Sequence, residues 1–388
     1  AGKNSKTIMF TKNFLYKDFI NKKKNKILIK NLKEIINNKN EIIRSLGNNY
    51  KYSYSKNLIK NLKKYKDIRI FGMGGSSLGS NAIYDFLKNK INKNFYFLSN
   101  LNKKTFSNRK YLNLIISKSG NTLETIVNSN IFIKKRDKNI LITENKKNIL
   151  RELSRKLKAE IIDHNNYIGG RYSVLSEVGM LPAELMGLQA NKFKQFNFLV
   201  KNKSFLSTMV SNVSNILSLI NKKKFNSVIL NYDETADNFL KWYQQLVAES
   251  TGKKGNGIFP IISTMPKDNH SLMQLYLDGK NTNFYTFFQT KENFSPKINK
   301  AIILPSQRFL KGKSLDDIVS SQILATKKVF LKKKIPFRSF YLKTRSEETL
   351  GELFTFFIIE TILLAKALKI NPYDQPAVEL IKLETKKI

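Results

Sequence analysis

The chain contains no cysteine and only two histidines, His164 and His270, among its 388 residues. Without cysteine there is no disulfide framework, no thiol nucleophile and no cysteine-ligated zinc. Two histidines are also too few for a histidine-rich metal centre. We therefore expect no metal site.

Long apolar runs are lacking as well. The most apolar stretch, Leu353 to Ala365, contains Thr355, Glu360 and Thr361, whereas a membrane-spanning helix needs roughly 20 predominantly apolar residues. The first residues are polar and do not resemble a secretory signal. We expect a cytoplasmic protein with no membrane partner, in which this stretch forms a buried helix.

Acidic residues are scarce: 29 Asp and Glu face 69 Lys and Arg, for a formal net charge of +40. Such an excess suits nucleic-acid binding, because clustered Lys and Arg neutralise phosphates. Lysine is, however, spread along the whole chain and accompanies Asn and Ile, as in residues 35–39, a pattern that A/T-rich codons also produce. We therefore expect no specific nucleic-acid partner, and the charge would at most draw anionic substrates toward the protein.

Short β-branched and aromatic runs alternate with helical stretches along most of the chain. This rhythm predicts an α/β fold with parallel sheets covered on both faces. Helices are also expected at 238–248, near Thr344, where Thr344 and Glu347 fit a capping box, and at Pro376, a favoured first helical position. The predicted strands are residues 68–71, 95–98, 114–116, 140–142, 228–230, 284–288 and 337–341.

The same pattern suggests how the chain divides into domains. We expect an N-terminal helical segment at 1–45, a first α/β domain at 46–204 and a second at 205–343. Residues 344–388 would form C-terminal helices that complete the active site.

Two glycine- and hydroxyl-rich turns follow predicted strands. Residues 72–79 read G-M-G-G-S-S-L-G and residues 117–122 read S-K-S-G-N-T. Glycine lets the backbone approach a ligand, and the helix that follows offers free N–H groups to an anion. The second turn holds more hydroxyls than one helix cap needs, so we interpret the pair as a phosphate cradle. Its candidate residues are Gly75, Ser76, Ser117, Lys118, Ser119 and Thr122.

Four later segments join these turns in a set that resembles the glucose-6-phosphate isomerase (phosphoglucose isomerase) family, built from sugar isomerase (SIS) domains. They are residues 169–179 (G-G-R-Y-S-V-L-S-E-V-G), 245–253 (Q-L-V-A-E-S-T-G-K), 268–279 (D-N-H-S-L-M-Q-L-Y-L-D-G) and 371–382 (N-P-Y-D-Q-P-A-V-E-L-I-K). All six occur in the family's order. Ala377 and Ile381 stand where the family commonly has glycine, which leaves the reactive side chains in place.

The resemblance implies two SIS-type α/β/α sandwich domains and an aldose–ketose isomerase of glycolysis and gluconeogenesis. Such an enzyme interconverts glucose 6-phosphate and fructose 6-phosphate through a cis-enediol, without a cofactor. Glu249 would carry the proton between C1 and C2, and Arg171 would face the enediolate charge. His270 and Lys382 would handle ring opening, and Gln375 would lie against the phosphate. The family also implies a homodimer in which His270 comes from the neighbouring subunit.

Two other functions fit the same phosphosugar loops. A dual glucose/mannose-6-phosphate isomerase would use the same residues, with pocket shape deciding the substrate. A non-catalytic SIS-domain protein that binds sugar phosphates would keep the serine loops. It would not need Glu249, His270 and Lys382 together, which favours an enzyme.

Overall fold

The structure, a computed structural model, describes residues 7–19, 25–38, 40–101, 103–292, 294–385 and 387. Its strands are β1 Thr7–Ile8, β2 Phe14–Lys17, β3 Asp67–Phe71, β4 Asn94–Leu98, β5 Leu112–Ile116, β6 Lys138–Thr143, β7 Glu160–Asp163, β8 Asn226–Asn231, β9 Phe259–Thr264, β10 Asn283–Thr290 and β11 Phe337–Leu342. Its helices are α1 Lys26–Asn37, α2 Glu41–Leu46, α3 Lys56–Leu62, α4 Leu78–Phe86, α5 Leu123–Phe132, α6 Ile149–Leu157, α7 Glu177–Leu185, α8 Phe196–Leu199, α9 Lys203–Asn221, α10 Asp237–Thr251, α11 Met273–Asp278, α12 Leu315–Lys332, α13 Glu347–Ala367 and α14 Pro376–Thr385.

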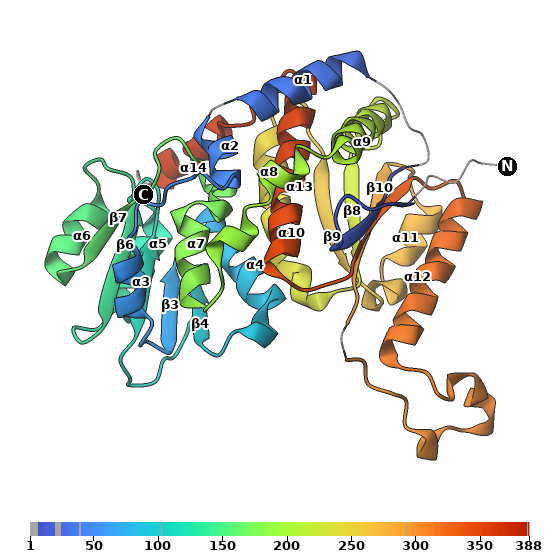
Figure 1. Ribbon diagram of the computed structural model, residues 1–388, viewed down its shortest axis with the longest axis horizontal. Coiled ribbons are helices and arrows are strands. Elements are labelled where there is room, and N and C mark those ends of the chain that lie inside the picture. Colours follow the sequence, from blue (N-terminus) through green and yellow to red (C-terminus); the bar gives the residue numbers. More distant parts are fainter. Residues whose placement is uncertain are drawn as a thin grey trace. The chain divides into compact units, whose positions relative to one another are not determined.

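These elements form two compact α/β units (Figure 1). Unit 1 contains the described residues of Ala1–Asn25, Ser207–Glu234 and Ile258–Arg345. Unit 2 contains those of Lys26–Leu206, Thr235–Gly257 and Ser346–Ile388. This grouping differs from the expected domains, because Thr235–Gly257 and the C-terminal helices pack with unit 2. The domain boundaries expected from the sequence stay a prediction.

Unit 2 is built on a parallel sheet with the strand order β4-β3-β5-β6-β7. Every residue of β5 is buried, as expected of a parallel strand covered on both faces. Helix α10 packs against α4 and α13, and α13 is buried along nearly its whole length. That burial explains its apolar sequence, and no helix in the described parts of the chain is long and apolar enough to span a membrane.

Unit 1 contains a sheet with the order β1-β2-β11-β10-β8-β9. Strands β8 to β11 are parallel, whereas β2 runs antiparallel to β11 and β1 antiparallel to β2. The seven strands predicted from the sequence are all present. The four others, β1, β2, β7 and β9, lie at or near sheet edges and are short or interrupted by charge or, at Pro260, by proline, features that weaken a strand signal.

Two local predictions were wrong. Helix was expected throughout 1–45, but it begins at Lys26, and residues 7–8 and 14–17 are strands; the remainder of the prediction lies partly in 1–6, 20–24 and 39, outside the described residues. Within β2, Phe14 and Tyr16 are buried while Leu15 and Lys17 are half-exposed, and this alternation fits a strand. Helix α13 is capped by Ser346, whose hydroxyl accepts from the Thr349 N–H at 3.1 Å, rather than by Thr344.

Candidate active site

The strand order of unit 2 identifies one end of its sheet as a ligand crevice. Numbered along the chain, the order β4-β3-β5-β6-β7 is 2-1-3-4-5. In such open sheets ligands bind at the carboxyl ends of the strands where the order reverses, here between β3 and β5. Both glycine- and hydroxyl-rich turns begin at these ends, one after Phe71 and the other after Ile116.

The first turn approaches the segment that carries Arg171. A Cβ on Gly75 would lie 2.1 Å from the carbonyl carbon of Gly170, so a larger residue would push the two loops apart. Gly74 has φ +51, a left-handed conformation that glycine adopts without strain. Ser76 is half-buried at the end of the 3₁₀ turn Gly74–Ser76. The turn is therefore fixed by close backbone packing.

The second turn is held by its own hydroxyls. The Ser117 and Thr122 hydroxyls lie 2.8 Å apart, and the Ser117 hydroxyl also accepts from the Gly120 N–H at 3.2 Å. The Asn121 N–H donates to the Ser119 hydroxyl at 3.3 Å. Burial lowers the pKa of Lys118. Hydroxyls, N–H groups and a lysine at the start of α5 form an arrangement suited to a phosphate.

Arg171 is buried and lies at the centre of a hydrogen-bond network. Its Nη1 donates to Glu249 Oε2 at 3.0 Å and to Gln375 Oε1 at 2.6 Å. Its Nε donates to the Ser250 hydroxyl at 2.9 Å, and Nη2 donates to the carbonyl oxygens of residues 372 and 374 at 2.5 and 3.0 Å. Because the planar guanidinium is bound from several directions, its orientation is fixed.

Glu249 lies in the last turn of α10, with its side chain 29% exposed beside the nearly inaccessible Arg171. Its second oxygen, Oε1, accepts from Gln245 Nε2 at 3.0 Å. Gln245 is four residues earlier, so it lies on the same face of the helix. One carboxylate oxygen is thus held by Arg171 and the other by Gln245, while part of the group stays open to solvent.

The structure brings some sequence-predicted residues into contact and leaves others apart. Arg171, Glu249 and Gln375 are joined by hydrogen bonds. Lys382 is 60% exposed and pairs with Glu379 at 2.6 Å, so its catalytic role stays a prediction. His270 is exposed in the 3₁₀ turn Lys267–His270 of unit 1, and its role stays a prediction too.

Sequence reasoning gave no role to three residues of this network: Gln245, Ser250 and Tyr172. The Tyr172 hydroxyl lies 2.7 Å from that of Ser250, which binds Arg171. The helical spacing of Gln245 and Glu249 could have revealed their contact. No local signal relates Tyr172 to Ser250, because 78 residues separate them.

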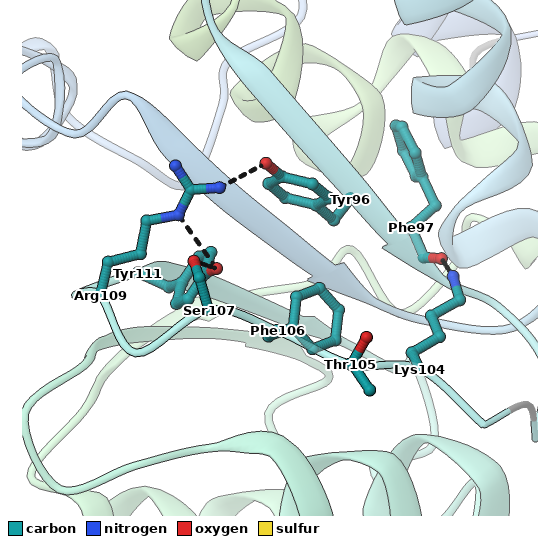
Figure 2. Close-up of a pocket in the computed structure, with 8 residues that line it drawn as sticks. All are labelled: Tyr96, Phe97, Lys104, Thr105, Phe106, Ser107, Arg109 and Tyr111. Carbon is teal, nitrogen blue, oxygen red and sulfur yellow. Dashed lines mark hydrogen bonds between the residues drawn. The ribbon is translucent and has the colours of Figure 1, made fainter.

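Two other places lack the glycine- and hydroxyl-rich turns. A pocket of about 470 Å³ beside β4 contains none of the motif residues. Figure 2 shows that its Arg109 donates to the hydroxyls of Tyr96 and Tyr111, and Arg109 also pairs with Asp67 at 3.2 Å. In unit 1 the ends of β8 and β10 are joined by Asp233, which accepts from the Thr290 hydroxyl at 2.5 Å and pairs with Arg345 at 2.9 Å.

Comparisons with known proteins agree with this geometry. A sequence model of the family described as "Phosphoglucose isomerase" matches residues 21–388. The chain is 34% identical over 358 residues to a glucose-6-phosphate isomerase of Methanocaldococcus jannaschii, covering 86% of each chain. It is 32% identical over 349 residues to one of Mycoplasmopsis pulmonis, covering 82% of each.

Solved structures share the fold. A glucose-6-phosphate isomerase of Chlamydia trachomatis has a TM-score of 0.77 at 17% identity, covering 97% of this chain and 88% of that one. A hypothetical protein of Thermus thermophilus has a TM-score of 0.80 at 21% identity, covering 93% of each. With the two phosphosugar-type turns, the Arg171–Glu249 pair and these matches together, the chain belongs to the phosphoglucose isomerase family.

Proposed function

We propose that this chain interconverts glucose 6-phosphate and fructose 6-phosphate by moving a proton between C1 and C2. The observation that carries the proposal is the contact between Glu249 and Arg171 in the same unit as the two hydroxyl-rich turns. A carboxylate held beside a permanent cation supplies both a base and a partner for the charge that develops.

In the proposed reaction, Ser76, Ser117, Ser119 and Thr122 hold the phosphate of the open-chain sugar. The Glu249 carboxylate removes the proton from C2 of the aldose, which leaves an enediolate. Glu249 then returns that proton to C1, while a proton passes between the two sugar oxygens. Atoms and charge balance without a cofactor or a metal, because the reaction is proton transfer alone.

Arg171 and Gln375 would stabilise the species formed on the way. The guanidinium is permanently cationic and already oriented by its neighbours, so it costs little reorganisation to face the enediolate. Gln375 accepts from Arg171 in the structure and is proposed to turn its amide toward the phosphate. His270 and Lys382 are proposed to open the sugar ring, on the basis of the family motifs.

The first test is a coupled assay of the purified protein with fructose 6-phosphate, following glucose 6-phosphate formation, beside a parallel assay with mannose 6-phosphate. Turnover of fructose 6-phosphate alone supports the proposal. Comparable turnover of mannose 6-phosphate would assign the dual-specificity alternative. Binding without turnover of either sugar would assign the non-catalytic alternative.

We also propose a homodimer working in the cytoplasm. Residues 294–314 of unit 1 extend beyond β10, β11 and α12 of the same unit (Figure 1). This segment exposes Phe294, Ile302 and Phe309 by 83, 73 and 74%, and a second copy would cover such apolar side chains. Sedimentation of the Phe294→Asp/Phe309→Asp variant should then show a lighter species than the unchanged chain. An unchanged sedimentation coefficient would place any dimer contact elsewhere.

A further inference from the structure

Unit 2 contains a second pocket, of about 920 Å³, that shares no residue with the candidate active site. Its wall carries three tyrosines at alternate positions, Tyr50, Tyr52 and Tyr54. The rings of Tyr52 and Tyr54 are stacked, with centroids 5.0 Å apart and planes 16° apart, and Tyr50 meets Tyr52 edge-on at 5.5 Å. The pocket therefore offers an aromatic platform large enough for a small organic ligand.

The same pocket is strongly basic. Its lining includes Lys194, whose buried Nζ lies 5.1 and 5.0 Å from the ring centroids of Tyr50 and Tyr52. Three exposed lysines, Lys51, Lys56 and Lys63, line the pocket, and Glu184 is the carboxylate among its lining residues. Burial lowers the pKa of Lys194 to about 7, so the three exposed ammonium groups carry the positive charge of the pocket, and against one carboxylate they favour a ligand with several negative charges.

Two polar groups in the wall, the hydroxyls of Tyr52 and Tyr54, are buried without a hydrogen-bond partner in the part of the chain that the structure describes. A buried hydroxyl without a partner is unfavourable, and an oxygen acceptor on a bound ligand would satisfy it. We propose that this pocket binds a nucleoside polyphosphate, with its nucleobase against the tyrosine rings and its phosphates among the lysines.

The chemistry favours this occupant over simpler ones. Bases stack on aromatic side chains whatever their identity, and lysine is a common phosphate ligand. An inorganic polyphosphate would use the lysines but not the platform. A nucleoside would use the platform but leave the lysines without counter-charge.

The pocket is physically connected to Arg171. Lys194 Nζ donates to the carbonyl oxygens of Ser45 and Leu175, and Leu175 ends the 3₁₀ segment Gly170–Leu175 that carries Arg171. The Tyr50 hydroxyl donates to Glu177 Oε2 at 2.8 Å, just beyond the same segment. A phosphate that draws Lys194 away from Leu175 would loosen the support of Arg171. Occupancy of the pocket should therefore lower turnover without competing with the sugar.

Calorimetric titration with magnesium-free ATP, pyrophosphate and adenosine tests the binding directly. ATP should bind more tightly than either fragment. The Lys51→Ala/Lys56→Ala/Lys63→Ala variant should raise its Kd by at least about tenfold. The matched variant Lys33→Ala/Lys135→Ala/Lys156→Ala, which removes three exposed lysines of unit 2 outside the pocket, should leave the Kd nearly unchanged.

Each other result overturns the proposal. Equal weakening by both triple variants would mean attraction by overall charge only. Equal affinity for pyrophosphate and ATP would mean that the nucleobase makes no favourable contact with the tyrosines. Loss of ATP binding in Ser119→Ala/Thr122→Ala would place the nucleotide in the phosphosugar cradle, and no binding of ATP would leave the pocket without this ligand.

The coupling to Arg171 rests on the proposed isomerase function, whereas the binding experiment does not. Saturating ATP should lower kcat for fructose 6-phosphate with little change in KM, and the Lys51→Ala/Lys56→Ala/Lys63→Ala variant should need at least about tenfold more ATP for the same effect. Purely competitive inhibition would overturn the coupling. A chain that binds ATP as expected but has no isomerase activity would contradict the proposed function and leave the pocket assignment intact.

Discussion

Arg171 Nη1 donates to Glu249 Oε2 over 3.0 Å. This contact joins two sequence motifs that are 78 residues apart and aligns the carboxylate with a cation whose own side chain is 1% exposed. Because Arg171 is held by backbone carbonyls as well, it stays in place when the carboxylate changes its protonation state. The pair is therefore arranged for repeated proton transfer at a fixed position.

Replacing Glu249 by glutamine should remove the base while keeping a side chain of the same shape, whose one amide oxygen can still accept from Arg171. We expect kcat to fall by about 10²–10⁴-fold, the usual contribution of a positioned acid or base, with substrate binding retained. Exchange of the C2 hydrogen with solvent should be lost in parallel.

Steady-state kinetics and hydrogen exchange by NMR measure both effects, and Glu152→Gln, an exposed position in α6, is the control. If Glu249→Gln keeps more than about a tenth of the original kcat, outside that range, another residue is the base.

Removing two hydroxyls from the second turn should weaken phosphate binding. In Ser119→Ala/Thr122→Ala we expect mainly a higher KM, because each hydrogen bond to a charged group contributes roughly 1.5–3 kcal/mol. The control variant Ser321→Ala/Thr326→Ala also removes one serine and one threonine hydroxyl, but from α12, where both bond to the helix backbone. It should leave KM unchanged. Unchanged kinetics in the first variant would rule out the cradle.

A comparison with Lys387 tests whether Lys382 is more than an ordinary surface lysine. Lys382 pairs with Glu379 and Lys387 with Glu384, each at 2.6 Å and three residues apart. Such exposed pairs contribute little to stability, so Lys382→Met and Lys387→Met should unfold at similar denaturant concentrations.

If Lys382 opens the sugar ring, only Lys382→Met should lose at least about tenfold in kcat, given that acid–base groups contribute about 10²–10⁴-fold. Equal kcat values for the two variants would leave Lys382 as a surface residue.

The proposed homodimer predicts complementation between inactive variants. His270→Ala and Glu249→Gln should each be inactive alone. After subunit exchange, some sites would combine an intact His270 from one subunit with an intact Glu249 from the other, so activity should return in part. Exchange can be followed with differently labelled chains, and no recovery despite exchange would mean that His270 acts within its own subunit.

His164 should make the protein less stable in acid. It is 2% exposed, its Nδ1 lies 2.9 Å from the carbonyl oxygen of Asn165, and burial lowers its pKa to about 4. Between about pH 6.5 and 4 the unfolded chain binds a proton that the folded chain does not, so stability falls as the pH is lowered through this window.

From pH 7 to 5 this one group should cost about 2 kcal/mol of unfolding free energy. Urea titrations at both pH values should show a smaller loss for His164→Gln than for the unchanged chain, whereas Asn145→Gln, an exposed neutral change, should behave like the unchanged chain. Equal losses in all three would mean that His164 takes up its proton in the folded state as readily as in the unfolded one.

Local chemistry was enough to predict the chain's main elements. The short runs at β3, β5, β8 and β10 are mainly apolar or aromatic, and the glycines after β3 mark the end of that strand. β2 and β7 have only four residues each and include charged ones, so their local signal was weaker than the tertiary pairing that holds these strands.

The sequence by itself determined the α/β class, the two phosphate-type turns and the family, because these depend on residue types at fixed spacing. Only the tertiary structure decided that the Arg171 guanidinium is bound at once by Glu249, Ser250 and Gln375, and that Lys194 supports the end of the same segment. Contacts between residues far apart in the chain depend on how helices and loops pack, and no local spacing records that packing.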